Sequence, residues 1–131
     1  IDPQARTLQW VRAGHDPALV YRPSQDRFEM LKGEGLALGV DRRMSYVTNV
    51  VDGLEAGQII AIATDGIFEA RDRHGDMFGH ARLKDTIRRC CTESARQIVE
   101  RVFEAVAAHV EGSPPEDDRT LVVIKHHPIP T

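Results

Sequence analysis

Apolar and polar positions form short runs in the first half of the chain and follow a helical period in the second half. The early runs are separated by Gly, Pro, Asn and Asp, which is typical of strands joined by turns. The first three are predicted to form an antiparallel meander, because short turns join them. The most apolar run, at 58–64, is expected to be a central strand with both faces covered. The expected strands lie at 8–12, 18–21, 28–31, 46–51 and 58–64.

From Gly79 the apolar residues fall at helical spacing, and a clearer amphipathic pattern begins at Ser94 and runs to Val110. Ser94 with Gln97 three residues later has the signature of a capping box, which marks the start of a helix. The stretch 112–115, Gly-Ser-Pro-Pro, is expected to end that helix. The second half therefore predicts two helices.

An apolar run at 121–125 follows the helices and is expected to be a closing strand. Strands followed by two helices and one more strand predict an α+β fold, with the helices near the C-terminal end laid on an antiparallel sheet. The chain has 131 residues, of which 41% are hydrophobic and 28% charged. These values fit one globular unit with a core of its own.

Charge and cysteine content narrow the class of protein. The formal net charge is -3, from 17 basic and 20 acidic residues, and no basic block is present, so we expect neither nucleic acid nor a membrane as partner. Cys90 and Cys91 are adjacent and form no C-x-x-C pair, which favours a reducing, cytoplasmic location. No apolar run reaches the roughly 18 residues of a membrane span, and there is no signal-peptide core.

Two acidic turns carry the candidate chemistry. Asp65 directly follows the strand expected at 58–64, and Asp117 and Asp118 precede the strand expected at 121–125. If these strands are neighbours, the carboxylates converge at one end of the sheet. Gathered carboxylates repel one another unless a cation joins them, and Mg²⁺, Mn²⁺ and Ca²⁺ prefer oxygen ligands.

Two neighbours of Asp65 extend this candidate site. Gly66 allows a sharp turn, and Glu69 falls on the same side as Asp65 if the turn continues as a helix. A purely structural interpretation remains open, since Asp-Gly after a strand and Asp-Asp before one are common turn and loop sequences.

Five short segments along the chain form a recognisable series: Ala13-Gly14-His15-Asp16-Pro17, Gly35-Leu36-Ala37-Leu38-Gly39, Thr64-Asp65-Gly66 with Glu69-Ala70, Phe78-Gly79, and Asp117-Asp118-Arg119-Thr120. Any one of them alone is weak, but their order and spacing together are specific. With them the chain resembles, over nearly its whole length, the PPM-type (PP2C-like) serine/threonine phosphatases of the bacterial SpoIIE and RsbU kind.

The resemblance implies an α-β-β-α sandwich and a metal-dependent hydrolase acting on phosphoserine or phosphothreonine. It implies a two-metal site with Mn²⁺ or Mg²⁺ as cofactor. Carried over by position, Asp65 and Asp117 become catalytic metal ligands, with Asp118 as the register alternative. Gly66 joins the metal site as part of the Asp-Gly motif, and Glu69 matches an acid near a weaker third metal.

The N-terminus departs from the family pattern. Relatives carry a further metal-binding aspartate well upstream of the Ala-Gly-His motif, yet only twelve residues precede Ala13. We therefore expect residues 1–131 to be the C-terminal part of a longer, here truncated, phosphatase domain, which can lack an essential ligand and thus activity. A truncated sandwich exposes strand edges and apolar faces, so we expect the fragment to associate as a dimer.

Two functions follow from the resemblance. The first is a metal-dependent protein phosphatase whose substrate is a phosphorylated bacterial signalling protein, such as an anti-sigma-factor antagonist. The second is a catalytically silent, phosphatase-like module that binds a regulatory protein. Retention of both Asp65 and Asp117 favours the enzyme, since a module that needs only shape has no chemical reason to keep unpaired acids there.

Overall fold

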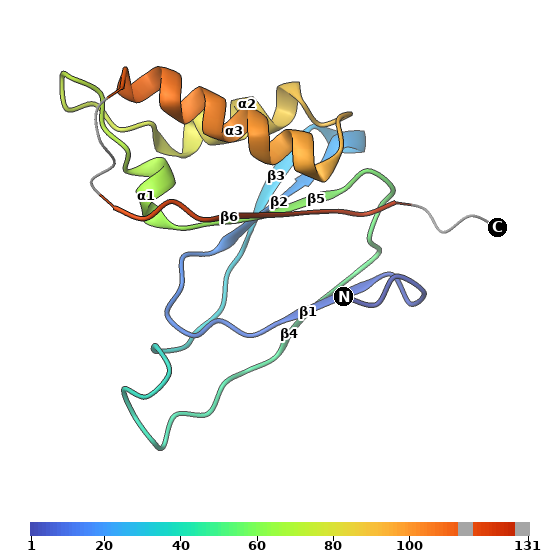
Figure 1. Ribbon diagram of the computed structural model, residues 1–131. Helices are drawn as coiled ribbons and strands as arrows, with labels where there is room; N and C mark the ends of the chain where they lie inside the picture. The colour runs from blue at the N-terminus through green and yellow to red at the C-terminus, as the bar shows by residue number, and fades with distance from the viewer. Residues whose placement is uncertain (113–116, 128–131) are drawn as a thin grey trace.

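The fold is a layer of helices, a four-stranded sheet and a two-stranded sheet, stacked in that order (Figure 1). The computed structural model describes residues 1–112 and 117–127. The strands are β1 Thr7–Trp10, β2 Ala18–Arg22, β3 Arg27–Leu31, β4 Asn49–Asp52, β5 Ile59–Ala63 and β6 Leu121–Lys125. The helices are α1 Asp65–Phe68, α2 Gly79–Arg89 and α3 Ala95–Val110, and a 3-10 turn spans Pro23–Gln25.

The larger sheet has the strand order β3-β2-β5-β6, and every neighbouring pair is antiparallel. β5 is internal and its first three residues are buried, which confirms the central strand expected from its composition. β6 pairs with β5 in a register that sets Ala63 opposite Leu121. The closing strand thus lies beside the strand that precedes Asp65.

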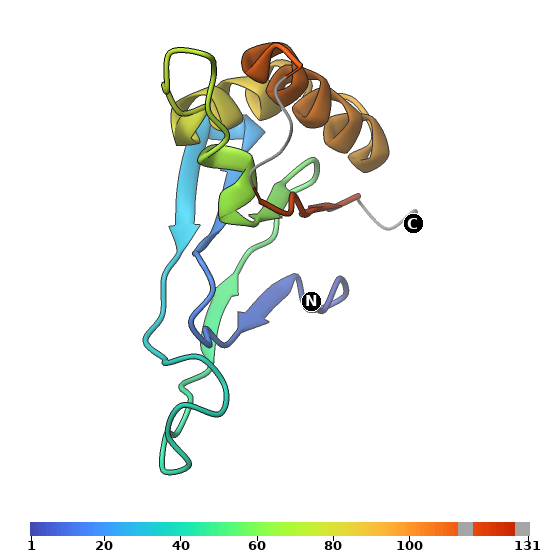
Figure 2. The same cartoon turned by 60° about the vertical axis from the view of Figure 1, so that its left-hand side comes forward.

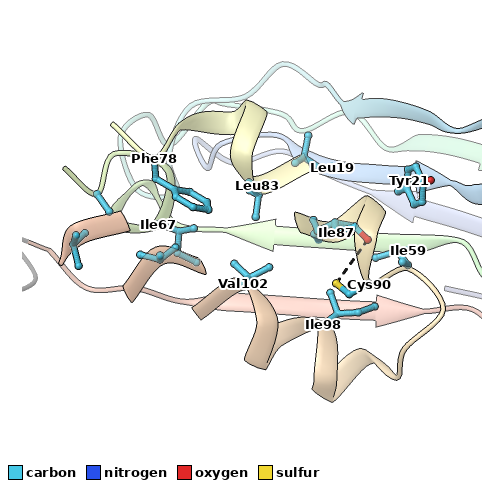
Figure 3. Close-up of a cluster of buried hydrophobic side chains, with 14 residues drawn as sticks. Leu19, Tyr21, Ile59, Ile67, Phe78, Leu83, Ile87, Cys90, Ile98 and Val102 are labelled. Atoms are coloured by element: carbon cyan, nitrogen blue, oxygen red, sulfur yellow. Dashed lines mark hydrogen bonds between the residues drawn. The ribbon is translucent and has the colours of Figure 1, made fainter. Parts of the chain in front are cut away.

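Helices α2 and α3 cover one face of this sheet and enclose the main core (Figures 1 and 3). Ile87 of α2 and Ile98 and Val102 of α3 are completely buried there, as the helical period predicts. The predicted capping box is present, because Ser94 and Gln97 each accept a hydrogen bond from the other's backbone amide. α3 ends at Val110, and the rest of the predicted stop, residues 113–115, lies outside the described part of the chain.

The predicted meander is wrong for its first strand. β1 pairs with β4 in a separate sheet, with Thr7 opposite Asp52, and does not pair with β2. The reason is that β2 already has β3 on one side and β5 on the other, so neither of its edges is free. β1 instead lies under the sheet's second face, where Leu8 packs with Val20 and Ile60.

The two-stranded layer covers that second face only in part. A pocket of about 260 Å³ lies between the layers and is lined mainly by apolar side chains, among them Trp10, Ile62 and Ile124. Val122 on the edge strand β6 is 46% exposed. The described residues therefore supply a helical layer and two sheet layers of the predicted α-β-β-α sandwich, and a second helical layer is not among them.

Candidate metal-binding site

The two acidic turns lie side by side at one end of the larger sheet. Because β5 and β6 are antiparallel, the end of β5 is next to the beginning of β6. Asp65 begins α1 directly after this end of β5, and Asp117 and Asp118 stand just before β6. Figure 1 shows α1 beside the start of β6. The sequence predicted that the two acidic turns converge if the strands beside them are neighbours. The strands are neighbours, and the prediction is confirmed for the backbones of the two turns.

Hydrogen bonds between two threonines hold the turns together. The Thr64 amide donates to the Thr120 carbonyl at 3.0 Å, and the Thr120 amide donates to the Thr64 hydroxyl at 2.9 Å. The same hydroxyl lies 3.2 Å from the Asp118 carbonyl, to which it can donate. These bonds fix Thr64, which directly precedes Asp65, to the residues Asp118 and Thr120 of the other turn.

Gly66 brings the backbones of the two turns into direct contact. A Cβ atom at this position would overlap the Asp118 carbonyl oxygen and would lie 3.4 Å from the Asp117 carbonyl carbon. On the other side, the Arg119 Nε donates to the Gly66 carbonyl oxygen at 3.2 Å. Glycine is needed at this position because of the close approach, and not because of an unusual φ.

The acidic side chains at this junction are exposed and unneutralised. Asp65 Oδ1 accepts a hydrogen bond from the Gly66 amide at 2.9 Å, and Asp117 Oδ1 accepts one from the Asp118 amide at 2.7 Å. Within residues 1–112 and 117–127, none of the salt bridges involves Asp65, Glu69, Asp117 or Asp118. Carboxylates on two turns whose backbones are in contact would repel one another, and a bound cation would relieve that repulsion.

The turn after Asp65 continues as a single helical turn. The Glu69 amide donates to the Asp65 carbonyl at 2.8 Å, so the predicted helical segment is present. Ile67 and Phe68 bury this turn in the core, which leaves Asp65 and Glu69 on its exposed side. The placement fits the expected position of Glu69, while its role as a ligand stays a prediction.

The donors at the junction are oxygen atoms, the type that a hard divalent cation prefers, but the described residues supply fewer of them than a complete coordination shell needs. The described residues contain no cluster of three or more His, Cys, Asp or Glu side chains able to hold a metal. Mg²⁺ needs only one or two protein carboxylates and keeps waters for its remaining positions. Asp65 and Asp117 could supply these, and the Gly66 carbonyl has a second lone pair beyond the one that Arg119 uses.

Two further motifs lie at the same end of the sheet. Ala18 begins β2 and is paired with Leu31, the last residue of β3, while Leu19 is paired with Ala61 near the end of β5. The turn at 13–17 and the loop at 35–39 therefore extend from the end that carries the acidic turns. Four of the matching sequence motifs thus gather at one end.

Histidines near the ends of strands have local structural contacts. The His15 ring Nδ1 is 2.9 Å from the Asp16 carbonyl, inside the turn. The His126 ring Nδ1 is 2.9 Å from the Glu55 carbonyl, just beyond the end of β6. The contact arises because β6 continues beside the start of β5, where the His126 amide donates to the Gln58 carbonyl.

Three residues that assemble the junction, Thr64, Arg119 and Thr120, belong to the matching motifs, but their role in joining the turns is not evident from the sequence. Threonine is common in strands, so Thr64 and Thr120 at strand ends attract no attention, and an arginine such as Arg119 is normally an exposed surface charge. Only the β5–β6 register shows that the residues before β6 lie beside those that follow β5. The signal that could have pointed to these residues is their position next to the acidic residues, in the sequences Thr64-Asp65-Gly66 and Asp117-Asp118-Arg119-Thr120.

Solved structures define the class of fold. The PP2C domain of SiaA from Pseudomonas aeruginosa superposes with a TM-score of 0.78 at 23% identity, over 93% of this chain and 47% of that one. A structure of the PP2C phosphatase domain of SpoIIE from Bacillus subtilis, with a fragment of its regulatory domain, gives 0.75 at 23% identity, over 93% and 35%. The fold is that of the PP2C domain.

The family follows from the sequence comparison. The family described as Stage II sporulation protein E (SpoIIE) matches residues 1–127, and the chain belongs to this family. The phosphoserine phosphatase RsbU of Bacillus subtilis is 27% identical over 116 residues, and protein IcfG of Synechocystis is 29% identical over 127 residues. The resemblance to PP2C-like phosphatases is thereby confirmed.

The chain spans only part of these relatives. It covers 34% of RsbU and 19% of IcfG, although 88% and 95% of its own length are aligned. Other structures of the same fold were solved after soaking with manganese, for SpoIIE, or in complex with magnesium, for RsbX. None of the helices in the described ranges is long and apolar enough to cross a membrane.

Proposed function

We propose that this chain supplies one side of the active site of a metal-dependent protein serine/threonine phosphatase. The observation that carries the proposal is the junction of the two acidic turns, where Asp65 and Asp117 form no salt bridge within the described part of the chain and their backbones are fixed by Thr64 and Thr120. Two carboxylates on fixed backbones are suited to bind a metal ion, because metal ligands must be held rigidly.

Asp65 and Asp117 would hold Mn²⁺ or Mg²⁺ in this site, with Asp118 as the alternative to Asp117. The ion, when bound, would neutralise charge on a phosphoryl group and lower the pKa of water. The chain's own contribution is positional: the Gly66 and Asp118 amides orient the two carboxylates, and the Thr64 hydroxyl keeps the turns in register. Glu69, on the exposed side of α1, is proposed as a ligand of a weaker, additional metal.

We also propose that residues 1–131 form part of a longer phosphatase domain, whose other part completes the ligand set. Two observations support this. The chain aligns over 93% of its length yet covers only 47% of the SiaA PP2C domain. The second face of its larger sheet carries a mainly apolar pocket that the two-stranded layer does not fill. We refer to the longer protein as the parent protein.

The substrate that we propose is a phosphorylated protein of a bacterial signalling pathway, such as an anti-sigma-factor antagonist. The description of RsbU as a phosphoserine phosphatase supports the reaction class. The competing function is a silent module that binds such a protein without turnover. The unpaired acids favour the enzyme, since a binding surface alone has no reason to keep like charges together.

The test is hydrolysis of p-nitrophenyl phosphate by the parent protein with Mn²⁺ or Mg²⁺. Asp65→Asn and Asp117→Asn should each lower kcat by about 100-fold or more, the scale of losing one electrostatic stabiliser of a transition state. Asp85→Asn is the matched control, because Asp85 is a partly exposed aspartate on α2 whose ion pair is with Arg89 in the same helix. This control should retain full activity.

A parent protein that is inactive with both metals, and also inactive on a phosphorylated protein, would favour the silent module. An active parent protein that tolerates both Asp65→Asn and Asp117→Asn would show that the metal is held elsewhere. If only Asp118→Asn abolishes activity, the register alternative is correct.

A further inference from the structure

The connection from β3 to β4, residues 32–48, contains no helix or strand. Loops longer than about 12 to 15 residues without secondary structure are uncommon in compact domains and are often functional. This one extends away from the three layers, below the larger sheet, in both views (Figures 1 and 2). Its size and position need an explanation that the fold does not provide.

The loop begins at the end of the sheet that carries the acidic turns. Leu31, the last residue of β3, is paired with Ala18, and the neighbouring Leu19 is paired with Ala61 of β5. Asp65 follows two residues after the end of that same strand β5. A protein bound to the loop would therefore lie at the acidic end of the sheet.

Specific contacts fix the base of the loop. The Trp10 indole Nε1 donates to the Lys32 carbonyl at 3.0 Å, and the Tyr46 hydroxyl donates to the Leu36 carbonyl at 3.0 Å. Gly14 lies against Ala37 so closely that a Cβ on Gly14 would be 2.9 Å from the Ala37 backbone. The first part of the loop is thus anchored to β1 and to the turn at 13–17, and the Tyr46 hydrogen bond ties its second part back to Leu36.

The fixed loop presents apolar side chains to solvent. Leu38 is 77% exposed, Val40 67%, Val47 63% and Leu36 50%. Exposed apolar area costs roughly 25 cal/mol per Å² relative to burial, and a group of such side chains on one segment is typical of an interaction site. We call residues 36–47 the apolar loop.

Charge on the apolar loop defines the kind of partner. Arg42 and Arg43 are exposed beside Asp41, and Arg43 pairs with Asp41 at 3.5 Å, an exposed contact that contributes little. Arg42 forms no salt bridge with any residue in the described ranges. A net positive segment next to an acidic site would attract an anionic protein that the carboxylates alone would repel.

We propose that the apolar loop docks the protein that carries the phosphorylated residue, through apolar contacts of Leu38 and Val40 and through Arg42 to an acidic surface. The proposal rests on the function proposed above and adds the surface that selects the substrate. The ester p-nitrophenyl phosphate has no protein surface that could dock on the loop, so its hydrolysis should not depend on the loop.

The experiment uses the parent protein and two readouts. The first is the Kd for a serine-phosphorylated anti-sigma-factor antagonist, measured with the Asp65→Asn form so that turnover does not interfere. The second is p-nitrophenyl phosphate hydrolysis by the enzyme with intact Asp65. Leu38→Ser with Val40→Ser should weaken binding at least about tenfold, the range of hot-spot residues, and leave hydrolysis within about twofold. Met30→Ser is the matched control, because Met30 is an exposed apolar residue of β3.

Unchanged binding by the double variant would overturn the docking proposal, whatever the enzyme does. Loss of both binding and hydrolysis together with a lower Tm would also overturn it, because the loop would then be covered by the rest of the parent domain. Weakened binding with no hydrolysis in any form would support the docking surface and reject the phosphatase. The two proposals therefore fail in different ways.

Discussion

Gly66 determines how closely the two acidic turns approach each other. The Gly66 backbone faces the Asp118 carbonyl with no room for a methyl group, and the Arg119 Nε donates a hydrogen bond to the Gly66 carbonyl oxygen. The positions of Asp65 and Asp117 relative to one another thus depend on a residue that carries no side chain.

Gly66→Ala should destabilise the chain by about 1–3 kcal/mol, because the added Cβ must push the two turns apart. It should also abolish the activity of the parent protein. Gly75→Ala is the control. Apart from the two chain neighbours, no atom of residues 1–112 or 117–127 lies within 4 Å of a Cβ there, so the positive φ is what opposes the change, at a cost of roughly 1–2 kcal/mol, and activity should remain. Urea denaturation and p-nitrophenyl phosphate hydrolysis measure the two effects. An active Gly66→Ala enzyme would contradict this account.

For single residues, the sequence predicts which side chains carry the chemistry better than it predicts the hydrogen bonds that position them. Asp65 and Asp117 are recognisable because each adjoins an apolar run in the chain. The hydrogen bonds of Thr64 with Thr120 join residues far apart in sequence and depend on the register of β5 and β6. A one-residue change of that register would turn the side chains to the other face, and composition does not specify it.

Among the elements, the β2–β3 hairpin is joined to α2 by one exposed ionic contact. Arg88 of α2 donates to Asp26 Oδ1 at 2.6 Å, and the Tyr21 hydroxyl donates to the same oxygen at 3.0 Å. Arg88 first and Tyr21 second hold the pKa of Asp26 below its ordinary value of 3.8. Arg88 also lies over the Phe28 ring, at 5.3 Å from its centroid.

Because the folded-state pKa of Asp26 is lowered, its contribution to stability is present above the unfolded value and is lost as the pH falls through the folded value. Arg88→Ala should therefore reduce the loss of stability between about pH 5 and pH 2. The Arg88→Ala variant should still lose some stability in acid, because backbone amides also lower the pKa of Asp72 in the folded state. Urea midpoints across this range measure the effect, with Arg96→Ala, an exposed change on α3, as control. Equal pH dependence in both variants would refute the role of Arg88.

The sequence predicted the helices well because their apolar periods and the Ser94 cap are local features. It failed for the partner of β1, because pairing depends on which strand edges are already occupied. Nothing within residues 8–12 shows that both edges of β2 are taken by β3 and β5.

For the whole molecule, the incompletely covered face of the larger sheet is the dominant feature. Val122, on the edge strand β6, is 46% exposed, and Ile62 and Ile124 line the pocket beside it. An exposed edge next to apolar surface favours pairing with another chain. In the parent protein, we propose, the remainder of the domain occupies this face.

The isolated chain should therefore self-associate, as a dimer at the lowest concentrations, when measured by sedimentation velocity. Val122→Lys should shift it towards the monomer, since a lysine on an edge strand opposes pairing. Arg96→Ala again serves as control and should not alter association. A monomeric chain at high concentration would contradict the prediction.

The position of β6 has a mechanical consequence. As an edge strand it is held to the sheet by β5 alone, and its Lys125 end is the one farther from the acidic turns. Tension on the segment after Lys125 would unzip β6 from that end, one ladder bond after another, and would reach Leu121 and the Asp117 turn last. Leu121 and Val123 of β6 pack against the core beneath the helices, and the Lys125 Nζ donates to the Cys91 and Glu93 carbonyls, so pulling β6 away would also open the helical core from that side.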